Sequence, residues 1–269
     1  MRLAVTIFAA LVLLFPVYYM AQGSFQDIQG VLSVPPRLAP KTPTLDNYEL
    51  LFSQPGIGRW ALNSLVAFVG YVGGSIVVNG TAGYAFSFAR FPGKGLLYGA
   101  FLAALMISRV SIIIPQFVLT RQIGLIGMPA VILMTAFSPA FIFLFRSYFD
   151  TIPRSLVECA RIDGAGDGRI FTRIILPLSG PIVGAVVVMR GVEALSDYIW
   201  QMLNLTADKS KTLLVGLTQA IHLVRMGRSM KDIGFELAVG MVLLVPLILI
   251  FALSSRYFIE GITLGGVKE

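Results

Sequence analysis

The chain has 269 residues, of which 56% are hydrophobic and 13% are charged, and its formal net charge is +7 at pH 7. Soluble domains carry about 25% charged residues, so this composition excludes an ordinary soluble domain, which would need a polar coat that the chain lacks. The positive charge predicts basic loops beside a membrane rather than nucleic-acid binding. The single Cys159 permits no internal disulfide, and one cysteine with one histidine predicts no metal site.

Six apolar runs are long enough to cross a bilayer, which takes about 20 helical residues. In chain order they are Leu3–Met20, Trp60–Val78, Gly95–Thr120, Met128–Phe145, Gly180–Trp200 and Phe235–Phe258. Backbone groups must be paired within hydrocarbon, and runs without strict alternation of apolar and polar residues exclude a closed barrel. The sequence therefore predicts an all-α integral membrane protein, a bundle of six transmembrane helices that forms one domain over residues 1–269.

Long polar segments connect some of these runs. Residues 23–59 are rich in proline and predict an extended loop, and residues 150–179 and 201–234 are the other long polar stretches. The first run is interpreted as a retained helix because it is longer than the core of a signal peptide. With both termini inside, the lysines and arginines of the loops divide ten to nine between the two sides, so charge alone does not determine the orientation.

The segment 150–179 predicts two short helices joined by a glycine corner. Ser155 and Glu158 have the spacing of a capping box for the first helix. Asp167 is placed to cap the second helix, and Pro177 to end or bend it before the fifth apolar run. Two short helices around a corner form a protrusion outside the membrane, which suits docking to another protein.

Charged residues inside the apolar runs suggest a second candidate site. Arg109 lies in the third run, and Arg190, Glu193 and Asp197 follow one another in the fifth at spacings that put them on one helix face. A charge at the bilayer centre costs about 2.5–3.5 kcal/mol, so it usually faces a cavity or a partner. Two interpretations remain open: a polar lining of a solute path, or mutual neutralisation of Arg190 and Glu193 within the bundle.

One spaced motif resembles a known family. Glu158-Cys159-Ala160, then Gly164, Ile174 and Leu176-Pro177, matches the EAA loop of bacterial ABC importer permeases at every spacing, with Cys159 in place of the usual alanine. Asp163-Gly164-Ala165 and the C-terminal stretch from Arg256 to Lys268 are similar to the carbohydrate-uptake branch, in particular to the maltose-transporter-type second permease. The resemblance implies the six-helix fold of type I ABC importer permeases, with a cytoplasmic coupling-helix loop.

The resemblance also implies roles for individual residues. It assigns coupling to an ATPase to Glu158, Cys159, Ala160, Asp163, Gly164, Ala165, Leu176 and Pro177. It assigns a tail contact with the ATPase to Gly265, Gly266, Val267 and Lys268. The glycines of this tail predict a flexible segment past Arg256. The four intramembrane charges, Arg109, Arg190, Glu193 and Asp197, are then the candidate solute path.

The implied protein is a non-catalytic permease subunit in the bacterial inner membrane, with its coupling loop and C-terminus in the cytoplasm. The chain has no Gly-x-x-x-x-Gly-Lys-Ser/Thr loop, so ATP and Mg are expected on partner subunits. The implied partners are a second homologous permease, two ATPase subunits, an extracytoplasmic solute-binding protein and the lipid bilayer. The expected function is uptake of a sugar or sugar-like solute by alternating access.

Two alternatives to that function stay open. The first is an ABC permease for a non-sugar or anionic solute, such as a glycerol phosphodiester, an opine or a sulfonated glycoside. Arg109 and Arg190 are compatible with an anionic group on the solute. The second is an ATP-independent secondary transporter or channel, which leaves the spacing from Glu158 to Pro177 without an explanation.

Overall fold

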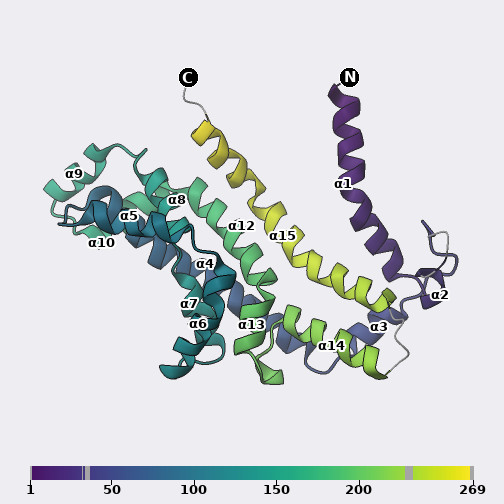
Figure 1. Cartoon of the computed structure of the whole chain (residues 1–269). Helices are drawn as coiled ribbons and strands as arrows, with labels where there is room; N and C mark the ends of the chain where they lie inside the picture. Colours follow the sequence, from purple (N-terminus) through teal and green to yellow (C-terminus); the bar gives the residue numbers. More distant parts are fainter. Residues whose placement is uncertain (1, 32, 34–36, 228–232, 267–269) are drawn as a thin grey trace. The chain divides into compact units, whose positions relative to one another are not determined.

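A computed structural model of the chain describes residues 2–31, 33, 37–227 and 233–266 (Figure 1). Within these ranges every regular element is a helix. Contacts divide the chain into two compact units, one of Met1–Asn63 with Ala207–Ile248 and the other of Ser64–Thr206 with Leu249–Glu269. Helices α4 (Ile57–Phe88) and α15 (Ile233–Gly266) contribute residues to both units.

The first unit is built around one apolar core. Its other elements are α1 (Arg2–Ser24), α2 (Ile28–Val31), α3 (Asp46–Phe52), η2 (Asp208–Ser210) and α14 (Leu213–Gly227). Leu51, Trp60, Leu217 and Phe235 are buried together in its core. The stretch 201–234, predicted to be polar, therefore contains an apolar helix, α14, whose inner face packs against α4.

The second unit contains the remaining helices and both candidate sites. They are α5 (Lys94–Ala104), α6 (Arg109–Gln122), α7 (Met128–Ala136), α8 (Pro139–Phe149), α9 (Arg154–Ile162), α10 (Asp167–Ile170), η1 (Phe171–Ile175), α11 (Leu176–Leu178), α12 (Gly180–Ser196) and α13 (Tyr198–Asn204). Two clusters of buried apolar residues form its core, one around Phe145, Phe149 and Phe171 and one around Tyr71 and Trp200.

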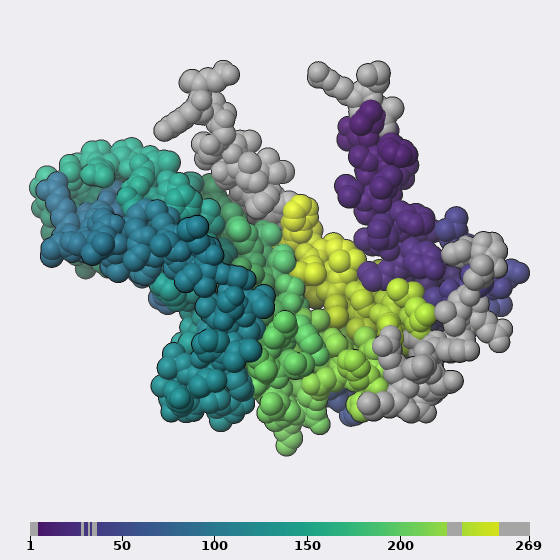
Figure 2. Space-filling model, in the orientation of Figure 1, coloured from purple at the N-terminus to yellow at the C-terminus, as the bar shows by residue number. Residues whose placement is uncertain are grey.

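Three of the six predicted spans are continuous helices, and three are bent. In the described residues α1, α4 and α15 are long and apolar enough to cross a membrane, and three bent helix pairs bring the number of spans to six. Gly95–Thr120, predicted as one helix, is broken into α5 and α6 with an angle of 107° between them. The break lies where Ser108, in extended conformation, and Arg109 interrupt the apolar run. In Figure 2 this turn lies within the blue and teal part of the surface.

The bend between α7 and α8 is held by one buried amide. The Asn79 side chain is completely buried on α4; its Nδ2 donates to the carbonyl oxygen of Ala136 (2.8 Å), and its Oδ1 accepts from the backbone N–H of Ser138 (2.9 Å). These backbone groups lie where the α-helical hydrogen bonding is interrupted. Asn79 therefore satisfies them at a position where water cannot.

Candidate functional site

The predicted glycine corner is present and has a defined geometry. α9 ends at Ile162, and Gly164 follows with φ +79°, a conformation that disfavours any residue with a Cβ atom. The backbone N–H of Gly164 donates to the carbonyl oxygen of Arg161 (3.0 Å), and that of Ala165 donates to Ala160 (2.9 Å). This pair of bonds is the Schellman motif, which ends a helix and turns the chain.

The predicted capping residues of this segment do not cap. α9 begins at Arg154 with Pro153 at its N-cap, so Ser155 already lies inside the helix, and no side-chain cap hydrogen bond is formed. The capping box is therefore wrong. Asp167 lies in the first turn of α10 rather than at its N-cap, which is Gly166. Its carboxylate has other partners instead.

Those partners connect the corner to the helix bundle. Oδ1 of Asp167 accepts a hydrogen bond from the Tyr84 hydroxyl on α4 (2.9 Å) and forms a salt bridge with Nη2 of Arg161 on α9 (2.9 Å). The hydrogen bond to Asp167 raises the pKa of Arg161 further above its usual value, so the guanidinium stays charged. The Tyr84 ring also meets Phe171 edge-on, with 5.7 Å between the ring centroids. The first turn of α10 is thus joined to both α4 and α9.

Helix α9 has one buried face and one exposed face. Val157 and Ala160 are buried in the same apolar cluster as Phe149 and Phe171. On the other face Leu156 and Cys159 are exposed, and Ile162 has an exposed fraction of 84%. An amphipathic helix with apolar side chains at its surface is able to dock on a second protein.

The second half of the segment leads into the fifth span through an irregular turn. Residues Phe171–Ile175 form a π-helix, η1, and the axis then bends by 83° between Leu178 and Gly180. Pro177 has no N–H to donate to the carbonyl of Arg173, so regular α-helical bonding is interrupted there. The predicted bend at Pro177 is therefore present, and Leu176 packs against the apolar cluster beside it.

The four intramembrane charges form two separate ion pairs. Nη1 of Arg190 donates to Oε2 of Glu193 (2.7 Å), and the Arg190 guanidinium lies 4.1 Å from the centroid of the Phe141 ring. Only 2% of Arg190 is exposed. The predicted neutralisation of Arg190 by Glu193 is therefore present, and this pair lies within α12.

The second pair joins different helices. Arg109, at the start of α6, forms a salt bridge with Asp197, and the Tyr71 hydroxyl donates to Oδ2 of Asp197 (3.0 Å). Asp197 is the C-cap residue of α12, where its backbone N–H still donates to the carbonyl oxygen of Glu193 (2.9 Å). The Arg109 side chain is 48% exposed, in contrast to that of Arg190. Among the described residues, no group of three His, Cys, Asp or Glu side chains could hold a metal ion.

Three functional candidates escaped the sequence interpretation: Tyr71, Tyr84 and Arg161. Tyr71 lies in the second apolar run and Tyr84 beyond its end at Val78, and their acidic partners are 126 and 83 residues away in the chain. No local spacing signals such a contact. From the sequence, Arg161 is only one of the basic residues of the loops. It reaches Asp167 because the chain turns at Gly164.

The C-terminal tail is helical as far as it is described. α15 continues to Gly266, so the segment past Arg256, predicted to be flexible, is helical up to that point. Each glycine in a helix costs about 1 kcal/mol relative to alanine. Isolated glycines therefore weaken a long helix without ending it. Gly265 and Gly266 are the last helical residues, and Val267 and Lys268 lie outside the described residues.

Comparisons with known proteins agree with this architecture. A solved bacterial ABC transporter that imports the acidic polysaccharide alginate contains a chain with the same fold, with a TM-score of 0.79 at 24% identity; the match covers 96% of this chain and 94% of the other. The arabinooligosaccharides transport system permease protein of Bacillus subtilis (strain 168) is 31% identical over 99% of this chain and 96% of the relative.

Two further relatives cover nearly the whole chain. The galactooligosaccharides transport system permease protein of Bacillus subtilis (strain 168) is 33% identical over 97% of this chain and 92% of its own. The sn-glycerol-3-phosphate transport system permease protein of Brucella suis biovar 1 (strain 1330) is 27% identical over 96% and 93%. The family described as "Binding-protein-dependent transport system inner membrane component" matches residues 80–263. The chain therefore belongs to this family, the inner-membrane permease components of binding-protein-dependent ABC importers.

Proposed function

We propose that this chain and a second, related permease form the translocation path for an oligosaccharide or similar sugar. Two ATPase subunits bind ATP and Mg and drive the path between inward and outward opening, and an external solute-binding protein delivers the sugar. The observation that carries the proposal is α9, an exposed helix whose position is set by the corner at Gly164 and by the contacts of Asp167. The oligosaccharide permeases among the relatives support the solute class.

The proposed coupling route runs from the surface of α9 into the bundle. The exposed face with Leu156, Cys159 and Ile162 docks on an ATPase subunit in the cytoplasm. Val157, on the opposite face, is buried in a cluster that includes residues of α4, α8 and α12. Protein interiors are close-packed, so a displacement of α9 is transmitted to these helices rather than absorbed. The tail from Gly265 to Lys268 is proposed as a second contact with the ATPases.

The proposed solute path uses the two ion pairs differently. Arg109 and Asp197 belong to separate helical segments, and the exposed Arg109 side chain is available to hydroxyl groups of a passing sugar. Arg190 is buried and supports the path through Glu193 and Phe141. Charged side chains in a membrane bundle usually face a cavity or a partner, which supports this assignment.

Uptake measurements test the solute class directly. In a strain that lacks only this chain, we expect uptake of labelled neutral oligosaccharides to fall at least ten-fold, and expression of the chain to restore it. Labelled arabino- and galacto-oligosaccharides, an α-glucoside and glycerol 3-phosphate are compared in parallel. Loss of glycerol 3-phosphate uptake alone would contradict the sugar assignment and favour the anionic alternative.

The thiol of Cys159 reports on docking of α9. Cys159 is the single cysteine of the chain and is exposed, so a maleimide should label it readily in the isolated permease. We expect labelling to slow at least five-fold when the ATPase subunits are bound, because the docked surface excludes the reagent. A cysteine introduced at exposed Arg121 provides the control. Equal protection of both positions, or of neither, would argue against docking through α9.

A further inference from the structure

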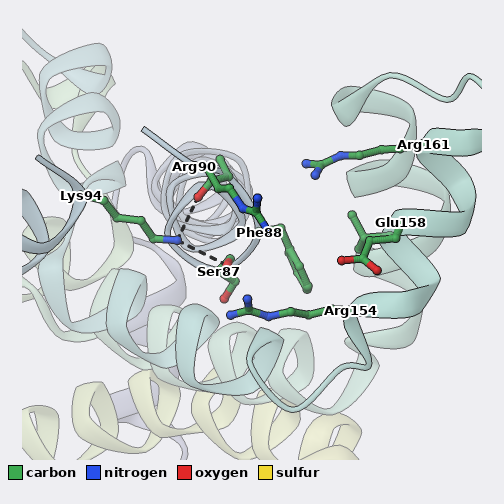
Figure 3. Close-up of a pocket in the computed structure, with 9 residues that line it drawn as sticks. Ser87, Phe88, Arg90, Lys94, Arg154, Glu158 and Arg161 are labelled. Atoms are coloured by element: carbon green, nitrogen blue, oxygen red, sulfur yellow. Dashed lines mark hydrogen bonds between the residues drawn. The ribbon is translucent and has the colours of Figure 1, made fainter. Parts of the chain in front are cut away.

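A small cavity with a basic lining lies beside α9, on the flank that faces the end of α4. Its volume is about 90 Å³, which is room for several water molecules and therefore for a phosphate group, but not for an oligosaccharide. Figure 3 shows Arg154, Glu158 and Arg161 extending from α9 toward Phe88, with Arg90 on the opposite side. Arg90 of the lining is exposed.

Lys94, one of the cations in the lining, is hydrogen-bonded to backbone carbonyl groups at the end of α4. Nζ of Lys94 donates to the carbonyl oxygen of Ser87 (3.4 Å), in the last turn of α4 (Figure 3), and to that of Ala89 (2.9 Å), the residue after the helix. Asp150, which lies beside this turn, accepts from Ser87 Oγ (2.8 Å) and pairs with Arg146 (3.5 Å). Lys94 therefore adds positive charge to the cavity and forms no salt bridge with a carboxylate of the described residues.

The arginines of the lining exceed the available acids. Arg161 is paired with Asp167, whereas Arg90 and Arg154 form no salt bridge with any described residue. Glu158 is the only carboxylate in the lining. The cavity thus presents guanidinium groups without a matching anion from the described part of the chain, which is the arrangement that planar recognition of a phosphate uses.

The position of the cavity relative to the apolar helices indicates where such an anion comes from. α4, 32 residues long, is apolar and ends at Phe88, and the apolar helix α5 starts at Lys94. The turn with Arg90 therefore lies at a membrane surface. Leu96, two residues after Lys94 of the lining, is 84% exposed and offers an apolar surface to an acyl chain. Basic pockets between membrane helices recognise anionic lipid headgroups in this way.

We propose that the cavity bounded by Arg90, Lys94, Arg154 and Arg161 binds the phosphate of an anionic phospholipid, whose acyl chains lie along α5. The site is separate from transport: it requires neither ATP hydrolysis nor a particular solute. Because Glu158 and Arg161 belong to α9, a lipid in this cavity contacts the same helix that is proposed to dock on the ATPase. The lipid would thereby hold the inner flank of α9 against the bundle.

The test measures lipid binding by the full-length chain in neutral detergent with native mass spectrometry. Phosphatidylglycerol and phosphatidylcholine are titrated separately against the wild type, Arg90→Gln, Arg90→Lys and Arg173→Gln. We expect Arg90→Gln to weaken phosphatidylglycerol binding about five-fold, the ratio that corresponds to about 1 kcal/mol per basic residue near an anionic lipid surface. Arg90→Lys should retain most of the binding. Arg173→Gln removes an exposed charge of the polar segment 150–179 that does not line the cavity, and it should leave binding unchanged.

Three results would overturn the proposal. The first is equal phosphatidylglycerol affinity in Arg90→Gln and Arg173→Gln. The second is displacement of the lipid by inorganic phosphate at a similar concentration, which would make the cavity a site for free anions. The third is a cross-link from R90C to an ATPase subunit in the assembled transporter with loss of the lipid adduct, which would identify an acidic protein segment as the occupant. None of these readouts depends on transport activity.

Discussion

Replacing Gly164 by valine is expected to reduce solute-stimulated ATP hydrolysis at least ten-fold while the permease remains folded in the membrane. At φ +79° a Cβ atom collides with the chain's own backbone, and left-handed conformations cost L-residues about 1–2 kcal/mol each, with more for β-branched side chains. A corner that opens to relieve this strain moves α9 away from its docking position. The effect is measured as ATP hydrolysis by the reconstituted transporter with and without loaded binding protein.

Gly166 provides a closely matched control for this experiment. Neither glycine has a neighbouring atom within 4 Å of an added Cβ, so neither substitution causes a clash with the rest of the chain. Gly166 has φ −72° and ψ 156°, which valine adopts readily. Gly166→Val should therefore couple normally. Normal coupling by Gly164→Val, or equal losses in both variants, would show that the conformation of the corner does not determine coupling.

Replacing Arg190 by leucine is expected to lower the amount of folded permease in the membrane about ten-fold. The substitution removes the buried cation above the Phe141 ring and leaves the Glu193 carboxylate, whose side chain is 37% exposed, without its partner. Removing one partner of a fully buried ion pair typically costs about 3–5 kcal/mol, and the partial exposure of Glu193 reduces that cost; replacing both partners by apolar residues is often neutral. The double variant Arg190→Leu with Glu193→Leu should therefore recover. The readout is the amount of monodisperse permease extracted from membranes.

Arg109→Leu separates a structural role from a role in the path. Its side chain is about half exposed, and the Asp197 carboxylate keeps the hydrogen bond from the Tyr71 hydroxyl, so we expect normal amounts of folded protein with reduced transport. If Arg190→Leu instead accumulates normally and changes solute preference, then Arg190 lines the path and its role is not structural. Failure of the double variant to recover would likewise contradict a role limited to pairing.

The sequence was sufficient for features that depend on local pattern. Apolar runs of bilayer length predicted the spans because hydrocarbon admits few alternatives, and Gly164 was identifiable because the family motif and the freedom of glycine agree. The corner itself required no knowledge of distant residues. Its geometry follows from hydrogen bonds between residues at most five positions apart.

Features that depend on tertiary contacts were missed or misplaced. The bend between α5 and α6 cannot be predicted from the sequence, because Gly95–Thr120 is one apolar run and hydropathy does not report the direction of a helix axis. The spacing places Asp197 in the candidate path but does not reveal its partners, because Arg109 and Tyr71 lie 88 and 126 residues away in the chain. Asp167 was assigned to a helix cap because its real partner, Tyr84, is 83 residues away.

The π-helix at Phe171–Ile175 sets how far the preceding segments, including α9, are rotated about the helix axis. A π-turn holds one more residue than an α-turn, so η1 acts as a single-residue insertion between α10 and α12. Deleting one residue there would restore α-helical bonding but rotate the flanking parts by about 100° about the helix axis. The length of this short stretch, rather than its composition, thus sets the direction in which α9 faces.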